Sequence, residues 1–301
     1  MSMRSMPFSS LILLALVIVA PTGYTEDDFS RVEIKTIPAA GQVSMLEGAG
    51  GNIGVSAGKD GILIVDDQFA PLSEKILTVL EGMQSGPVKF VLNTHWHGDH
   101  TGGNEEFGKI ATLIAHTNVR KRLSAEQVSE FLQRTIAPKA EIGLPVITFD
   151  DSVSIHFNGE EIEVIHFPRG HTDGDSIVFF TKSNVVHMGD HFFNGSFPFV
   201  DLESGGSVQG YMRNIEEVLN TVSEDAILIP GHGPLGDVDD LRAFYAMLIK
   251  TTDLILGKLA EEMSVDQIKQ AGLGAEWESW GQGFITEGRW IDIVYASYTK
   301  K

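Results

Sequence analysis

The sequence predicts an α/β (α+β) protein in which two β-sheets lie between helices, with their connecting loops gathered along one edge. Runs of apolar or alternating residues typical of strands are followed by amphipathic helices, and this succession occurs twice along the chain. The 301 residues are 43% hydrophobic and 21% charged, which is enough for the core of one large domain or two small ones.

The first succession of elements occupies the first half of the chain. Residues 32–67 alternate apolar residues with glycine-containing turns, typical of successive antiparallel strands. Residues 71–83 place apolar side chains at helical spacing after a proline, which predicts a helix. Apolar runs predict strands over 88–92 and 110–115, and residues 118–134 are expected to be largely helical.

The second succession begins with two predicted hairpins. The Asn158–Gly159 pair lies between two alternating runs within 152–167, a strong signal for a tight β-hairpin turn. Residues 176–188 show the same pattern, with two apolar runs on either side of a short polar segment, and predict a second hairpin. The remaining expected elements are helices over 207–222 and 237–263, a buried strand over 226–229, and a mostly helical tail over 265–298 in which Trp277, Trp280 and Trp290 pack.

The N-terminal segment has the form of a secretory signal. Arg4 precedes an apolar run of ten residues from Leu11 to Ala20, and helix-breaking and polar residues follow. Ten apolar residues are too few to span a bilayer but fit the central region of a signal peptide. We therefore expect residues 1–25 to be removed and 26–301 to form a single domain that is periplasmic or secreted, without stable membrane association. An uncleaved N-terminal anchor is the alternative.

Charge and cysteine content restrict the function classes. There are 41 acidic and 22 basic residues, giving a formal net charge of −19. Such a chain repels nucleic acid and anionic membranes, so the expected partner is a small-molecule substrate. Cysteine is absent, so any metal site must be built from His, Asp and Glu.

Residues 93–103 carry the strongest functional signal, N-T-H-W-H-G-D-H-T-G-G. Three imidazoles and one carboxylate, from His95, His97, Asp99 and His100, fall within six residues. Imidazole nitrogen and carboxylate oxygen suit zinc, with iron and manganese as alternatives. This spacing predicts a site for one or two divalent cations, against the alternative of a solvated turn without function.

Three further metal-ligating side chains follow predicted strands. His171 comes after the strand 161–167, Asp190 after 185–188 and His232 after 226–229, and each has a glycine beside it. Glycine lets the backbone turn sharply so that a small site can close around an ion. Because all three follow strands, we expect them to join the histidine-rich loop at one edge.

Together these motifs resemble those of the metallo-β-lactamase superfamily. H-W-H-G-D-H is followed in order by G-H-T-D-G-D, G-D and P-G-H-G, and the resemblance extends over residues 32–301. It implies a four-layer αββα sandwich with a two-metal site, expected to hold two Zn²⁺ ions, at the edge of the central sheets. The implied ligands are His95, His97 and His171 for the first metal, Asp99, His100 and His232 for the second, and Asp190 bridging the two or binding the second.

The resemblance also implies a mechanism. A zinc ion with an open coordination position lowers the pKa of its bound water to about 7, so a metal-bound hydroxide becomes the nucleophile. Asp99 would orient this hydroxide and take its proton, which makes it the expected catalytic residue. The reaction expected is hydrolysis of a lactone, thioester, ester or β-lactam.

Two departures from the best-known antibiotic-hydrolysing subclass bear on the substrate. That subclass has Cys where this chain has Asp190, and Lys where it has Phe193. The chain is similar instead to a periplasmic β-lactamase-like branch with Asp at the ligand position, and strong β-lactamase activity is not expected. Phe197 and Phe199, in the loop after Asp190, are predicted either to form an apolar wall for substrate or to pack within the loop.

Two other functions stay open from the sequence. One is an iron-dependent oxidoreductase on the same scaffold, although redox members resemble a pattern with Glu at the position of His97. The other is a non-catalytic periplasmic metal-binding accessory protein. Among the remaining histidines, His156, His166 and His187 are expected to be structural, and His116 and His191 could support the site from behind the ligands.

Overall fold

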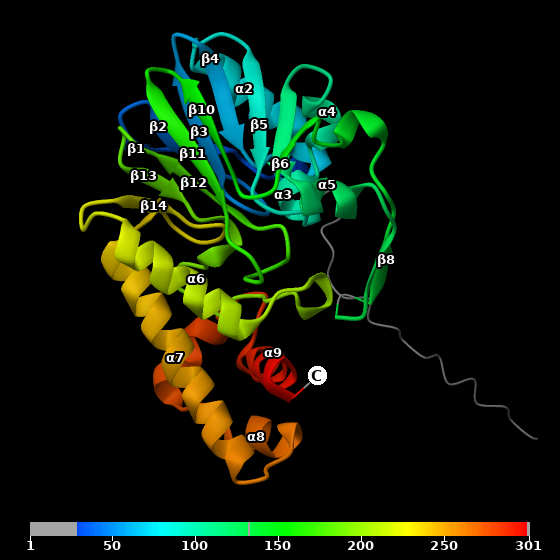
Figure 1. Ribbon diagram of the computed structural model, residues 1–301, viewed down its shortest axis with the longest axis vertical. Helices are drawn as coiled ribbons and strands as arrows, with labels where there is room; N and C mark the ends of the chain where they lie inside the picture. Colours follow the sequence, from blue (N-terminus) through cyan, green and yellow to red (C-terminus); the bar gives the residue numbers. More distant parts are fainter. Residues whose placement is uncertain (1–28, 132, 300–301) are drawn as a thin grey trace, which may run out of the picture.

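The computed structural model describes residues 29–131 and 133–299 (Figure 1). The predicted signal segment, residues 1–25, lies outside the described residues. Two sheets face each other, and helices cover their outer faces, which gives the αββα sandwich expected from the resemblance. Within these ranges, no helix combines the length and the apolar character that crossing a membrane requires.

The first sheet has seven strands in the order β1-β2-β3-β4-β5-β6-β9. Strands β1 to β4 are antiparallel neighbours, as predicted for residues 32–67, and β4, β5, β6 and β9 run parallel. The strands are β1 (Lys35–Ala40), β2 (Val43–Glu47), β3 (Ile53–Gly58), β4 (Gly61–Val65), β5 (Val88–Asn93), β6 (Thr112–His116) and β9 (Ile147–Phe149).

The second sheet has six strands in the order β10-β11-β12-β13-β14-β15. Both predicted hairpins are present, and β13 and β14 are its one parallel pair. The strands are β10 (Ser152–Phe157), β11 (Glu160–His166), β12 (Ser176–Phe180), β13 (Val185–His187), β14 (Ile227–Ile229) and β15 (Gly236–Asp237).

The remaining elements connect or cover the sheets. The α-helices are α2 (Ser73–Gly82), α3 (Gly98–Thr101), α4 (Asn104–Phe107), α5 (Thr117–Leu123), α6 (Val208–Thr221), α7 (Val238–Ala260), α8 (Val265–Ala271) and α9 (Glu287–Thr299). The 3₁₀ turns are η1 (Ala70–Leu72), η2 (Glu141–Gly143), η3 (Gly189–His191), η4 (Leu202–Ser204) and η5 (Ala275–Gln282).

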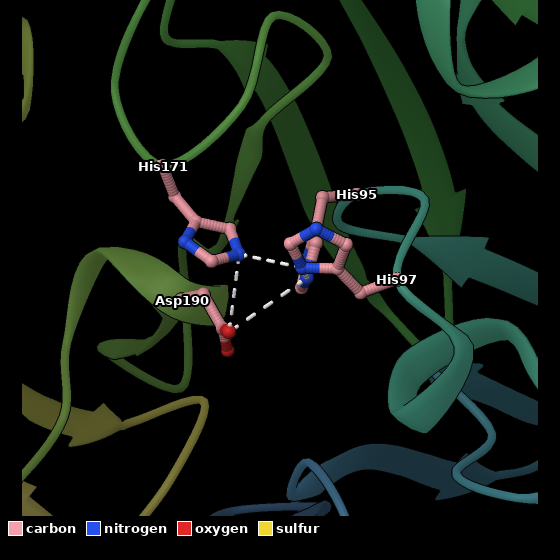
Figure 2. A group of neighbouring side chains, drawn as sticks. All are labelled: His95, His97, His171 and Asp190. Atoms are coloured by element: carbon pink, nitrogen blue, oxygen red, sulfur yellow. Dashed lines mark hydrogen bonds and ion pairs between the residues drawn. The ribbon is translucent and has the colours of Figure 1, made fainter. Parts of the chain in front are cut away.

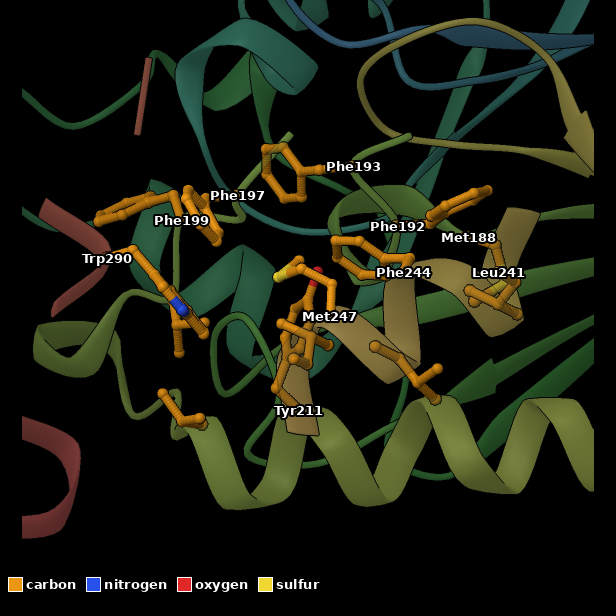
Figure 3. Packing of buried hydrophobic residues seen from close by; sticks show 14 of the residues in the cluster. Met188, Phe192, Phe193, Phe197, Phe199, Tyr211, Leu241, Phe244, Met247 and Trp290 are labelled. Carbon is orange, nitrogen blue, oxygen red and sulfur yellow. The ribbon is translucent and has the colours of Figure 1, made fainter. Parts of the chain in front are cut away.

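The period-two pattern of the strands produces three apolar layers. In β4, Ile62 and Ile64 point outward to the cluster that holds α2, whereas Leu63 and Val65 point inward to the layer between the sheets. On the outer face of the second sheet, a larger cluster joins α6, α7 and α9 around buried side chains that include Phe192, Tyr211, Phe244 and Trp290 (Figure 3). These layers fix the strand ends on which the candidate site stands.

The prediction of a helix through residues 118–134 is wrong in its second half. Helix α5 ends at Leu123, and a short hairpin follows, formed by β7 (Gln127–Ser129) and β8 (Arg134–Ile136). The helix stops because its last carbonyls find partners outside it: the Gln127 side chain donates to the carbonyl of Arg122, and the Lys139 N–H donates to that of Leu123. These contacts, one local and one from a residue 16 positions further on, therefore override the helical preference here.

Candidate metal centre

The candidate ligands converge from four segments of the chain at one edge of the sandwich. Figure 2 shows four of them, His95, His97, His171 and Asp190. His95 and His97 follow β5, and Asp99 and His100 lie on α3. His171 follows β11, Asp190 lies in η3 after β13, and His232 follows β14. Their ligand atoms fall into two groups, each within 4.8 Å: His95, His97, His171 and Asp190, and then Asp99, His100 and His232. The structure therefore brings all seven predicted ligands together.

In the first group, each ring has a partner on its outward nitrogen. The His171 Nδ1 lies 2.7 Å from the carbonyl oxygen of Phe199, and the His97 Nε2 lies 2.9 Å from Asp201 Oδ2. Each of these nitrogens must carry the proton, because a carbonyl or carboxylate oxygen can only accept. The opposite nitrogens, His171 Nε2 and His97 Nδ1, then present lone pairs to each other 2.8 Å apart.

His95 also has its proton on the outer nitrogen, because of a chain of hydrogen bonds. The Thr94 hydroxyl donates to Asp66 Oδ2 at 2.7 Å, so Thr94 Oγ1 accepts from His95 Nδ1 at 3.0 Å. The His95 Nε2 therefore presents a lone pair to His97 Nδ1 at 3.1 Å. Three ring nitrogens without protons thus point at one place.

The second group is built around His100. Its Nδ1 donates to Asp66 Oδ2 at 2.7 Å, and its Nε2 faces the Nε2 of His232 at 3.3 Å. Asp99 Oδ2 lies 3.4 Å from the His232 Nε2 and 3.8 Å from that of His100. Here two imidazole nitrogens and one carboxylate oxygen surround a second candidate metal position.

Asp190 connects the two groups. Its Oδ2 faces the first, 3.3 Å from His171 Nε2 and 3.7 Å from His95 Nε2, and its Oδ1 faces the second, 3.0 Å from His100 Nε2 and 3.4 Å from His232 Nε2. The buried Oδ1 has no hydrogen bond of good geometry. A carboxylate with one oxygen toward each group has the arrangement of a bridging ligand.

This donor set fits divalent metal ions. Lone pairs that converge without a proton between them repel each other, and a cation placed among them removes that repulsion. Nitrogen and oxygen donors without sulfur suit zinc, iron or manganese. The partners on the outward nitrogens hold the rings in the orientation that binding requires.

The pKa shifts separate the two groups. Burial lowers the pKa of His171 to about 4 and that of His95 well below its usual value, so both rings are neutral and ready to ligate. Burial opposes the charged form of His100 and His232, but the nearby carboxylates, Asp190 first and then Asp99, together outweigh it and raise the pKa of both rings. The second group therefore binds metal in competition with protons.

Glycines allow the site to close. A Cβ atom at Gly231 would overlap the carboxylate of Asp190, and one at Gly51 would overlap the His100 ring. The glycine in the P-G-H-G motif is thus required by the close approach of its backbone to a ligand.

Sequence reasoning missed two supporting residues, Asp66 and Asp201. Asp66 directly follows the buried strand β4, so the strand-end signal that found Asp190 could also have found it. Asp201 lies in the loop after Asp190 and carries no such signal. Its side chain also caps η4 by accepting from the N–H groups of Glu203 and Ser204.

The two phenylalanines predicted as a substrate wall lie in different places. Phe199 stacks on His97, with ring centroids 5.7 Å apart, and so borders the site. Phe197 is buried in the core and stacks on Trp290 (Figure 3), which turns it away from the ligands. Phe199 alone of the pair is placed beside a candidate ligand.

The two histidines expected near the site also differ. His191 is buried, stacks on Tyr211, and pairs with the side chain of Asn214. Tyr211 in turn donates to the backbone carbonyl of Asp190 at 2.7 Å, so this pair packs behind a ligand. His116 stacks on His166 instead, with centroids 3.8 Å apart.

The chain is similar in sequence to several known proteins. The family model described as the metallo-beta-lactamase superfamily matches residues 55–232, more than half of the chain. A probable metallo-hydrolase of Methanocaldococcus jannaschii is 28% identical over 189 residues, covering 60% of this chain and 86% of that protein. A metallo-beta-lactamase type 2 of Bacillus cereus is 23% identical over 196 residues, covering 65% and 69%.

Solved structures show the same fold. A metallo-beta-lactamase from Pontibacter korlensis superposes with a TM-score of 0.58 at 18% identity, covering 72% of this chain and 99% of that one. At this identity the likeness shows the αββα fold.

Replacing Asp201 should weaken zinc binding without unfolding the protein. Asp201→Ala removes the acceptor that fixes the His97 ring, and outer partners of this kind contribute about 10- to 100-fold in metal affinity. Asp201→Asn keeps an acceptor without the charge, so its zinc affinity should lie between those of Asp201→Ala and the original chain. Competition with a chromophoric chelator measures the affinity, and equal affinity in all three proteins would contradict this role.

The stacked histidines should make the metal-free protein sensitive to acid. Burial, helped by the neighbouring ring, lowers the pKa of His116, and burial lowers that of His166. Below about pH 6.5 the unfolded chain therefore binds protons first, and stability falls as pH decreases, by at most about 1.4 kcal/mol per pH unit for each proton.

His166→Phe keeps a ring in the stack and removes one titrating group. Urea unfolding between pH 7 and pH 5 should give a shallower loss of unfolding free energy for the variant than for the original chain. Equal slopes would show that His166 does not titrate differently on folding.

Proposed function

The chain belongs to the metallo-β-lactamase superfamily and is a metal-dependent hydrolase; from this we propose that it uses two zinc ions to hydrolyse a small carbonyl substrate, which is a lactone, thioester, ester or β-lactam. The single observation that carries the proposal is the placement of Asp190, whose two oxygens face two separate groups of ligand atoms. One ion would leave one of these groups without a cation.

The seven candidate ligands would be shared between the two ions. His95, His97 and His171 would hold one ion, Asp99, His100 and His232 the other, and Asp190 both. When bound, zinc supplies a water activated at neutral pH and a positive charge near the oxygen that becomes negative during hydrolysis. The protein residues supply orientation and proton transfer.

Asp99 is the best-placed proton acceptor. Its side chain is 29% exposed, whereas that of Asp190 is 5% exposed, so Asp99 can reach a substrate. Burial opposes its ionisation, but His100 and His232 hold its pKa below the usual value. Asp99 is therefore ionised at neutral pH, and its Oδ2 can orient a nucleophile and accept a proton.

The position that carries Lys in the best-known antibiotic-hydrolysing subclass is apolar here. The Phe193 ring stacks on the candidate ligand His232, with centroids 4.9 Å apart and planes 16° apart. An aromatic ring there cannot pair with a substrate carboxylate. This supports weak activity on β-lactams and favours substrates that need no such clamp.

We also propose that the enzyme acts outside the cytoplasm. The apolar run from Leu11 to Ala20, with Arg4 before it and polar residues after it, supports export.

The test is a substrate panel with the zinc-loaded protein. Lactone, thioester, ester, penicillin and carbapenem substrates are assayed before and after chelation, alongside His97→Ala and Asp99→Ala. At least one non-lactam substrate should reach a kcat/KM above about 10⁴ M⁻¹s⁻¹. Chelation should remove the activity, His97→Ala should lose metal and activity together, and Asp99→Ala should reduce the rate at least about 100-fold.

Other outcomes would replace the proposal. Full activity in both variants would contradict the mechanism. Tight iron with oxygen consumption would indicate an oxidoreductase. Two bound zinc ions without turnover of any substrate would indicate a metal-binding accessory protein.

A further inference from the structure

Aromatic side chains continue outward from the candidate metal centre. Phe199 contacts the rings of both His97 and His171, with centroids 5.7 Å away in each case. Its ring also stacks on Phe131 at 4.7 Å and meets the edge of Phe284 at 6.3 Å. Phe131 and Phe284 contact each other at 6.3 Å. We call Phe131, Phe199 and Phe284 the aromatic ledge.

The ledge is assembled from three distant parts of the chain. Phe199 lies in the loop after Asp190, and Phe131 lies at the turn between β7 and β8, the arm on the right of Figure 1. Phe284 precedes α9. The family match ends at residue 232, so Phe284 belongs to a part of the chain outside it. The ledge therefore combines two residues inside the matched range with one outside it.

Exposure along the ledge increases away from the metal centre. Phe199 is 9% exposed, Phe131 is half-buried, and Phe284 is 58% exposed. A single exposed phenylalanine is common on protein surfaces, but contiguous aromatic rings that lead to a polar centre are typical of a ligand-binding wall.

Arg289 completes the ledge. Its guanidinium lies 5.0 Å from the Phe284 ring centroid and 5.6 Å from that of Phe131, and it donates to the carbonyl of Phe284 at 2.8 Å. It forms no ion pair with any carboxylate in ranges 29–131 and 133–299. Its charge would repel a cationic ligand and attract an anionic one.

We propose that the aromatic ledge binds the acyl part of the substrate, and that this part is an aromatic group, uncharged or anionic. The inference rests on the proposed hydrolase function and names its substrate class. A ring seated against Phe131 and Phe284 would place the carbonyl group toward His97, because Phe199 joins these two rings to that ligand. Phe284 would determine specificity, and Arg289 would position the two outer rings.

The test compares acetyl and phenylacetyl versions of an ester or thioester that the zinc-loaded enzyme cleaves. The original chain should prefer the phenylacetyl substrate. Phe284→Ala should reduce kcat/KM for the phenylacetyl substrate about tenfold, through a higher KM, because one aromatic contact contributes roughly this factor. It should change kcat/KM for the acetyl substrate less than about twofold. Arg289→Gln should lower the preference in the same direction.

Leu254→Ala is the matched control, since Leu254 is a 40% exposed apolar residue on α7. This variant should leave kcat/KM unchanged for both substrates. Thermal unfolding identifies any variant that fails to fold, and Phe284→Leu, which keeps an apolar side chain without the ring, then replaces Phe284→Ala. An unchanged substrate ratio in folded Phe284 variants would overturn the ledge while leaving the hydrolase function intact.

A binding measurement separates the ledge from the hydrolase function. If no substrate is cleaved, titration calorimetry of the zinc-loaded protein with phenylacetate and with acetate still tests the ledge. Tighter binding of phenylacetate that is lost in Phe284→Ala would support it even though the hydrolase proposal had failed. Equal binding of the two acids would overturn it.

Discussion

The site depends on one constraint: imidazole nitrogens from distant segments converge in a buried place with their protons turned outward. Asp201 and the Phe199 carbonyl accept from the outer nitrogens of His97 and His171, so the inner nitrogens of these two rings meet as lone pairs. Such an arrangement costs free energy unless cations lie among the rings. The placement of Asp190, with one oxygen toward each group, is the basis of our proposal that there are two of them.

The packed sheets hold the ligand-bearing loops in place. Strands β5, β13 and β14 are held by apolar layers on both faces, so the loops that follow them start from fixed positions. The buried His187 bonds to the backbone of Asn52, and the Asn52 side chain bonds to the carbonyls of Pro230 and Gly233, which ties the two sheets together beside the ligands. On our proposal, substrate selection depends on the β7–β8 arm and the segment before α9.

The sequence predicted the ligands better than their surroundings. A histidine at a strand end beside glycine is a local pattern, so His171 and His232 could be placed from the chain alone, and the H-W-H-G-D-H run placed His95 in the same way. The hairpin after α5 could not be placed, because the helix end also depends on the Lys139 N–H, which reaches the carbonyl of Leu123 only in the folded chain. Phe197 and Phe199 are two residues apart, and only packing determined that one faces Trp290 and the other His97. Phe131 and Phe284 become neighbours only in the folded chain.

The most direct test of the two-metal site is a cobalt titration of the metal-free protein, followed by visible absorption. The account predicts two equivalents bound per chain in the original protein and a single equivalent in His232→Ala, because that change removes a ligand of the second group alone. It also predicts that the second equivalent binds more weakly as pH falls, since His100 and His232 must release protons to it. One equivalent in both proteins, or two in both, would contradict the assignment of the seven ligands to two ions.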